Sequence, residues 1–183
     1  MRYIYTGLFN FKKRKIKKKR AQLCDDIEIF IQVHFVRERN NTKNKYNTLS
    51  LKSDPDRDAC KEWYENHGNP KTFSEIVLAY IKASDLKEDQ ICDKCGFEKS
   101  FISKLKNEKN YHPSKGEAVL LAIAFKLNFE ETKALLMSAE HALTNSSKED
   151  LIIRYFIEQK EYSISNLNYV LEKFCELKIK DIM

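Results

Sequence analysis

Helix-start signals recur from residue 72 onward, and they constrain the fold of this 183-residue chain more than any other feature. A Ser, Thr or Asn with an acidic residue three positions later is typical of a helix N-terminus, because these side chains cap exposed backbone N–H groups. The pattern occurs at Thr72–Glu75, Ser114–Glu117, Asn128–Glu131 and Ser147–Asp150. Each cap contributes on the order of 1 kcal/mol. The sequence therefore predicts a series of short helices, the last of them starting at Ser163 or Ser165.

Apolar residues recur at helical spacing in each of these segments. The stripes are Phe73, Ile76, Val77, Tyr80 and Ile81; Ala118 to Leu127; Leu135, Leu136 and Ala139; Leu151, Ile152, Tyr155 and Phe156; and Ile164, Leu167, Val170, Leu171 and Phe174. Four glycines and three prolines are few for a β-sandwich or barrel. We predict an all-α fold. The last two stripes are too apolar to face water, so they cover either the bundle or a second subunit, and a homodimer through them is a candidate.

Two short helices are predicted between residues 86 and 109, joined by a tight turn at Gly96, where a C-cap favours a residue that adopts positive φ. On the second helix Ser100, Ser103, Lys104 and Asn107 follow i, i+3, i+4, i+7 spacing and form one polar stripe. A fixed helix pair with an outward row of short hydrogen-bonding and basic residues has the geometry of a DNA-reading helix-turn-helix.

The Gly96-Phe97 turn, the run from Ser100 to Leu105 and the following Asn107 resemble the helix-turn-helix of the lambda-repressor-like (XRE-type) regulators. The resemblance covers roughly residues 72–143. It implies a five-helix domain over 71–144 and a DNA-binding transcriptional regulator. The last two apolar stripes and their caps predict two additional C-terminal helices in 145–183.

The chain departs from the family pattern at three positions, Glu88, Glu98 and Glu108, where glutamine, serine and glycine are usual. Carboxylates at the first two would lie close to DNA phosphates, where like charges repel. Residues 71–144 also hold eleven basic and eleven acidic side chains and no arginine. The alternative is therefore a protein-interaction or dimerisation module that keeps the fold without sequence-specific DNA readout.

A second resemblance rests on the runs SKLKNEKNYHPSK and SSKEDLIIRYFIE and on the Ala-Leu-rich helix between them. They look like a C-terminal helical module found behind macro-type domains in bacterial proteins. This resemblance implies an accessory or regulatory module and brings no catalytic residue with it.

The DNA-binding hypothesis assigns roles to particular side chains. Ser100, Ser103, Lys104 and Asn107 would face the major groove, while Lys99, Lys106 and Lys109 would bind phosphates. Double-stranded DNA is the expected partner.

The N-terminal region is strongly basic, with eight Lys or Arg in residues 12–20. They are Lys12, Lys13, Arg14, Lys15, Lys17, Lys18, Lys19 and Arg20. Such a run usually forms a solvated, poorly ordered arm, so residues 1–24 are predicted to be a basic tail. The alternatives are sequence-independent contact with nucleic acid, or with an anionic membrane or an acidic partner. Residues 25–70 are predicted to be a helix followed by a polar linker, although the alternating apolar residues of 27–36 fit a strand equally well.

Little in the sequence indicates catalysis. The four histidines are scattered, and no glycine-rich phosphate loop occurs. Cys92-x-x-Cys95 lacks a second ligand pair, so we expect both thiols in the core rather than in a metal site. We predict no enzymatic activity, cofactor, metal or membrane partner, and a cytoplasmic protein with reduced cysteines.

Overall fold

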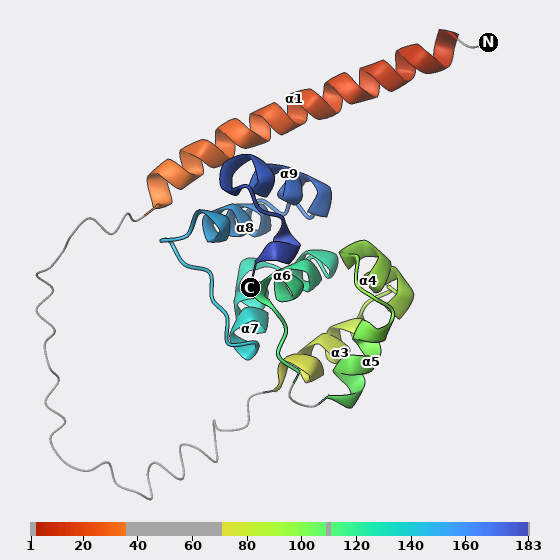
Figure 1. Ribbon diagram of the computed structural model, residues 1–183, viewed down its shortest axis with the longest axis vertical. Coiled ribbons are helices and arrows are strands. Elements are labelled where there is room, and N and C mark those ends of the chain that lie inside the picture. Colours follow the sequence, from red (N-terminus) through yellow and green to blue (C-terminus); the bar gives the residue numbers. More distant parts are fainter. Residues whose placement is uncertain (1–2, 36–70, 109–110, 183) are drawn as a thin grey trace, which may run out of the picture.

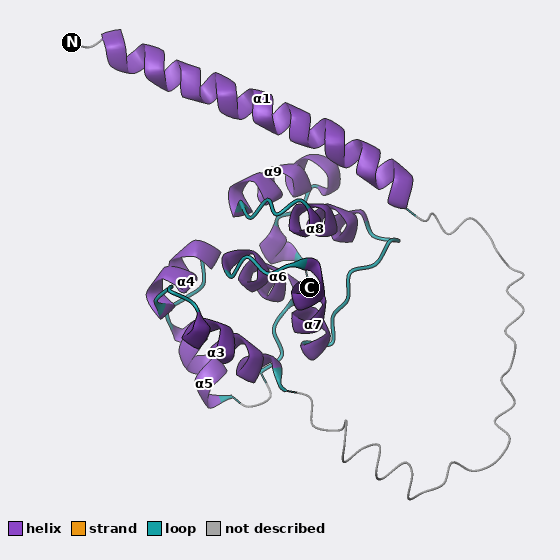
Figure 2. Cartoon of the chain, turned by 180° about the vertical axis from the view of Figure 1, so that it is seen from behind, coloured by secondary structure: helices purple, strands orange, loops and turns teal. Residues whose placement is uncertain are grey.

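The computed structural model describes residues 3–35, 71–108 and 111–182, and within these ranges every regular element is a helix, joined by loops and turns (Figures 1 and 2). The helices are α1 (Tyr3–His34), α3 (Phe73–Ala83), α4 (Glu88–Cys95), α5 (Ser100–Asn107), α6 (Lys115–Ala124), α7 (Phe129–Ser138), α8 (Lys148–Glu158), α9 (Ile164–Cys175) and a 3-10 turn, η1 (Ile179–Asp181). The all-α prediction is confirmed for the described residues. The polar linker predicted within 25–70 lies almost wholly outside them.

Five helices begin at the capping residues that the sequence predicts. Thr72, Ser114 and Asn128 each form a reciprocal capping box with the Glu three residues later. Ser147 and Ser163 also cap their helices, α8 and α9. Ser163, rather than Ser165, therefore starts the last helix. The caps fix where each helix begins, and the spacing of the apolar residues decides which face of it packs in the core.

Helices α4 and α5 are joined by the expected tight turn. Gly96 adopts φ +66°, in the left-handed region that glycine favours, and the Phe97 N–H donates to the Cys92 carbonyl at 2.9 Å. The ring of Phe97 stacks on Phe101 with centroids 4.2 Å apart. The turn is thus held by a backbone hydrogen bond and by aromatic packing at its corner.

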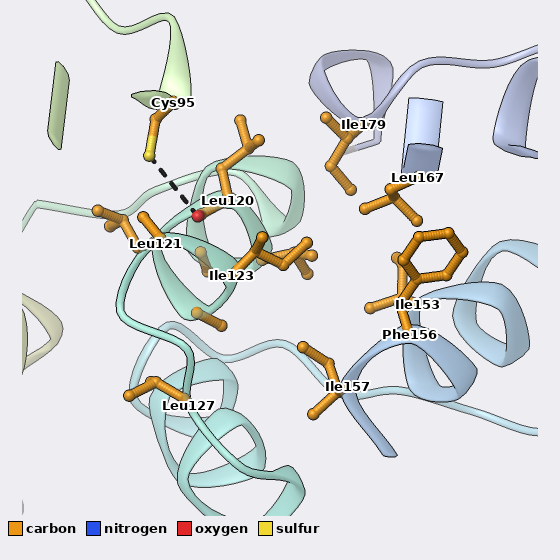
Figure 3. Packing of buried hydrophobic residues seen from close by; sticks show 14 of the residues in the cluster. Cys95, Leu120, Leu121, Ile123, Leu127, Ile153, Phe156, Ile157, Leu167 and Ile179 are labelled. Atoms are coloured by element: carbon orange, nitrogen blue, oxygen red, sulfur yellow. Dashed lines mark hydrogen bonds between the residues drawn. The ribbon is translucent and has the colours of Figure 1, made fainter. Parts of the chain in front are cut away.

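Helix α6 is the centre of the core. Every residue from Ala118 to Ala124 is at most 2 % exposed, and α6 contacts α4, α7 and η1. Figure 3 shows Leu120, Leu121 and Ile123 on this helix, with Ile153 and Phe156 of α8 on the other side of the same apolar cluster. Side chains from 71–144 and from 145–183 therefore build one core.

A buried ion pair joins these two parts of the chain. Lys115 at the start of α6 lies 2.6 Å from the Asp150 carboxylate near the start of α8, and the Asp150 side chain is 3 % exposed. Asp150 also accepts hydrogen bonds from the Thr144 backbone N–H and hydroxyl. The carboxylate is thus satisfied by three donors, as a buried charge requires.

The C-terminal turn η1 packs against the N-terminus of α6. The Gly116 N–H donates to the Ile182 carbonyl at 3.0 Å, and a Cβ at Gly116 would lie 2.0 Å from the Ile179 carbonyl oxygen. Only a residue without a side chain allows this approach. No signal in the sequence predicts the contact.

The apolar stripes of α8 and α9 are buried within the chain. Leu151, Ile152, Phe156, Leu167 and Val170 are all 0 % exposed, and α8 contacts α1, α7 and α9. These stripes were predicted to cover either the bundle or a second subunit, and in the structure they cover the bundle. A homodimer stays a prediction, and it would need other side chains.

The N-terminal region differs from a poorly ordered tail. Residues 3–34 form one continuous helix, α1, which crosses the predicted boundary at residue 24 and ends within the segment that fitted helix or strand, so residues 27–34 are helical. Cys24, Ile27 and Ile31 are buried, and the helix contacts α8. Its N-terminal half extends past the bundle in both views (Figures 1 and 2). The basic run is ordered as a helix because the buried stripe that follows it anchors α1 to the bundle.

Candidate nucleic-acid interface

Helix α5 turns its apolar side inward and its polar side to solvent. Phe101, Ile102 and Leu105 are at most 5 % exposed and belong to the core cluster. The polar side chains predicted to face outward are all exposed: Ser100, Ser103, Lys104 and Asn107, together with Lys99 and Lys106. Lys109 lies outside the described residues. The structure thus brings six of the seven predicted residues to one helix and its N-cap.

Two of these side chains already bind acidic neighbours within the protein. The Ser100 hydroxyl donates to the Glu98 carboxylate at 3.2 Å. Lys106 pairs with Glu88 of α4 at 2.7 Å, and both side chains are about half exposed. The pairing offsets the charge of Glu88, one of the departures from the family pattern, and it takes Lys106 out of the set of free cations.

The remaining outward side chains, Ser103, Lys104 and Asn107, have no hydrogen-bond or ion-pair partner among the described residues. Lys99 is likewise exposed without a partner there. These groups offer two amine cations, a hydroxyl and an amide. They can bind phosphate oxygens and the donor and acceptor groups of base edges.

An open cleft of about 290 Å³ lies beside the N-terminus of α5. Ser100 and Lys104 line one side, and Tyr111 and Glu117 line another. Lys180 completes the lining and donates to the Gly96 carbonyl of the α4–α5 turn. Lys180 was absent from the sequence-based set, because 84 residues separate it from its contact at Gly96.

Tyr111 is held in the cleft by Glu117. Its hydroxyl lies 3.3 Å from each carboxylate oxygen. Burial, reinforced by the negative charge of Glu117 and the hydrogen bond to it, raises the pKa of Tyr111 to about 12. The phenol therefore remains a neutral donor at physiological pH.

The basic segment of α1 forms a second exposed set of cations. Lys13, Arg14, Lys15, Lys17, Lys18 and Lys19 are exposed, and Arg20 is partly buried. The side chain of Lys12 is not among those described. Lys19 pairs with Glu161 at 2.9 Å, and Arg20 donates to Ser165 and Asn166. The last two cations of the segment thus hold α1 on α9 and on the turn that precedes it.

Cys92 and Cys95 lie in the core, as predicted. These two are 3 % and 2 % exposed, and the Cys95 thiol donates to the Leu120 carbonyl at 3.6 Å. Burial raises the pKa of Cys95 to about 12 and also raises that of Cys92. Cys24 and Cys175 are free thiols as well, while Cys60 lies outside the described residues.

Comparisons with family models, with curated proteins and with solved structures find no match to this chain. Within the described part of the chain, no three His, Cys, Asp or Glu side chains gather as a metal site. The described helices also include none that is long and apolar enough to cross a bilayer.

Proposed function

We propose that the protein is a DNA-binding regulator whose α4–α5 pair acts as a helix-turn-helix within a lambda-repressor-like five-helix bundle, α3 to α7. The role is that of a transcriptional regulator or an accessory regulatory module without catalysis. One observation carries the proposal. The α5 face opposite the core presents Ser103, Lys104 and Asn107 to solvent with no partner among the described side chains.

The chemistry of this face favours DNA over a protein partner. Protein interfaces are enriched in aromatic side chains and depleted in Lys and Ser, whereas short hydroxyl and amide groups flanked by lysines suit base edges and phosphates. Asn107 can form paired hydrogen bonds with an adenine edge, and Ser103 can bond to any base. Lys99 and Lys104 supply the phosphate contacts.

A second candidate, a protein-interaction module, is favoured by the acidic side chains around α5. The Glu98 carboxylate accepts a hydrogen bond from the Ser100 hydroxyl at 3.2 Å, and Glu88 forms an ion pair with Lys106 at 2.7 Å. Both pairs remove groups that would otherwise contact DNA. The same groups could serve a partner that carries a basic surface.

The test is binding of the full-length protein to mixed genomic DNA fragments at several salt concentrations. The double variant Ser103→Glu/Lys104→Glu adds negative charge at the proposed groove contacts. We expect its affinity to fall at least tenfold and its salt slope to decrease by about one, because each phosphate contact contributes about 0.9 to the slope.

The matched control is Lys133→Glu/Ala134→Glu on the exposed side of α7, which changes the net charge by the same amount. We expect it to bind nearly as well as the wild type. Equal losses in both double variants, or no loss in the α5 variant, would favour the protein-interaction candidate.

A further inference from the structure

The exposed cations of α1 point to a second contact that does not depend on α5. We propose that the segment from Arg14 to Lys18 is a helical arm that binds the phosphate backbone of duplex DNA without sequence preference. Four cations of this segment, Arg14, Lys15, Lys17 and Lys18, are exposed and have no carboxylate partner among the described residues.

The arm is held in place by its C-terminal neighbours. Leu23, Cys24, Ile27 and Ile31 pack in the core cluster, and α1 contacts α8. Nearer the arm, the Arg20 guanidinium lies 4.5 Å from the ring centroid of Tyr169 on α9. Apolar packing and polar contacts together fix the direction in which the helix leaves the bundle (Figure 1).

Helical periodicity places three of the four free cations, Arg14, Lys15 and Lys18, on the side of α1 away from this anchor, and Lys17 on its flank. With 100° between successive residues, Arg14 and Lys18 lie on the side of the helix opposite Ile27. The exposed Ile29, 62 % accessible, continues that outward side on the anchored half. Lys19 and Arg20 therefore bind other parts of the protein, whereas Arg14, Lys15, Lys17 and Lys18 face solvent.

The charge density of the arm matches that of its proposed ligand. A helix rises about 1.5 Å per residue, so Arg14 to Lys18 place four charges along roughly 6 Å. Duplex DNA carries about one phosphate per 1.7 Å of its axis. A preformed helix also avoids most of the ordering entropy that a disordered arm loses on binding.

A membrane surface fits the described part of the arm less well. A helix that lies in a lipid interface needs an apolar face beside its charged one. Ile16 is the one large apolar side chain from residue 13 to residue 20, and cations occur on every side of the helix there. Anionic vesicles therefore serve as the competing ligand in the test.

The variant that tests the arm is Arg14→Gln/Lys15→Gln/Lys17→Gln/Lys18→Gln in the full chain, because glutamine removes the charge and keeps helix propensity. The control is Lys82→Gln/Lys126→Gln/Lys133→Gln/Lys160→Gln, which removes four exposed cations elsewhere. Circular dichroism should give equal helix content for both. Binding to a 25-base-pair duplex of random sequence is then measured by fluorescence anisotropy over a range of KCl concentrations.

We expect the arm variant to lower the slope of log K against log salt by about 3 to 4, from about 0.9 per phosphate contact, and the control to keep the wild-type slope. An unchanged slope in the arm variant, or an equal change in both variants, overturns the proposal. It is also overturned if the loss appears only with an RNA duplex of the same sequence. Arm-dependent sedimentation with phosphatidylcholine–phosphatidylserine vesicles and an unchanged DNA slope would overturn it in favour of a membrane.

The same assay separates this inference from the proposed function of α5. Loss of random-duplex binding in the arm variant, with none in Ser103→Glu/Lys104→Glu, supports the arm and counts against DNA contact by α5. The reverse pattern overturns the arm and leaves α5 as the contact.

Discussion

At the scale of single residues, Gly116 shows how a long-range contact selects an amino acid. In a helix, Gly→Ala ordinarily stabilises by about 0.5–1 kcal/mol. Here the added Cβ would meet the Ile179 carbonyl oxygen at 2.0 Å, an impossible approach. We expect Gly116→Ala to destabilise the protein by about 1–3 kcal/mol, the usual range for overpacking. Urea denaturation measures the change, and a gain in stability would show that η1 does not pack on α6.

Tyr111 gives a prediction about pH. Its pKa rises from about 10 unfolded to about 12 folded, chiefly through burial and then through Glu117. The stabilisation is therefore fully present below pH 10 and is lost as the pH rises toward 12, since the unfolded state then releases the proton more readily. We expect the wild type to be more stable than Tyr111→Phe at pH 8 and to lose that advantage by pH 11.5. Urea midpoints of both proteins at the two pH values measure this, and a constant difference would contradict it.

At the scale of elements, the docking of α1 depends on its buried stripe. We expect Ile27→Ala to cost about 2–5 kcal/mol in unfolding free energy, because Ile27 is fully buried. Ile29→Ala makes the same chemical change two residues along, at a side chain that is 62 % exposed, and should stay within about 0.5 kcal/mol. Chemical denaturation of both variants compares them. Equal effects would mean that α1 does not pack as described.

Local signals predicted the helices that begin with a cap, and missed what depends on distant contacts. The Thr72 and Ser114 boxes fixed helix starts because both partners lie within one turn. The extent of α1 was not predictable, since the basic run repels itself locally and becomes ordered through Ile27 and its neighbours. The η1 contact at Gly116 and the position of Lys180 likewise depend on how residues 179–182 pack against α6 and the α4–α5 turn.

The candidate site was predictable in part for the same reason. The outward row of α5 follows from helical spacing, so the exposure of Ser103 and Asn107 agrees with the sequence reading. The pairing of Lys106 with Glu88 does not follow from it, because the two residues lie on different helices.

At the scale of the whole molecule, the exposed cations of α1 and the polar face of α5 are separated. The cationic segment lies near the middle of α1, the helix that runs along α8 and α9, while α5 lies on the other side of the shared core (Figure 1). The two proposed contacts can therefore be removed independently. The arm and the α5 lysines should both contribute to affinity for any duplex, whereas sequence preference should depend on α5 alone.

The most direct test of the central claim, that the solvent-facing side of α5 contacts DNA, is the change in backbone amide NMR signals when a duplex is added. We predict that the signals of Ser103, Lys104 and Asn107 shift and saturate together, while those of α7 residues Lys133 and Ala134 stay unchanged. Shifts confined to α1, with the α5 signals unmoved at saturation, would contradict it.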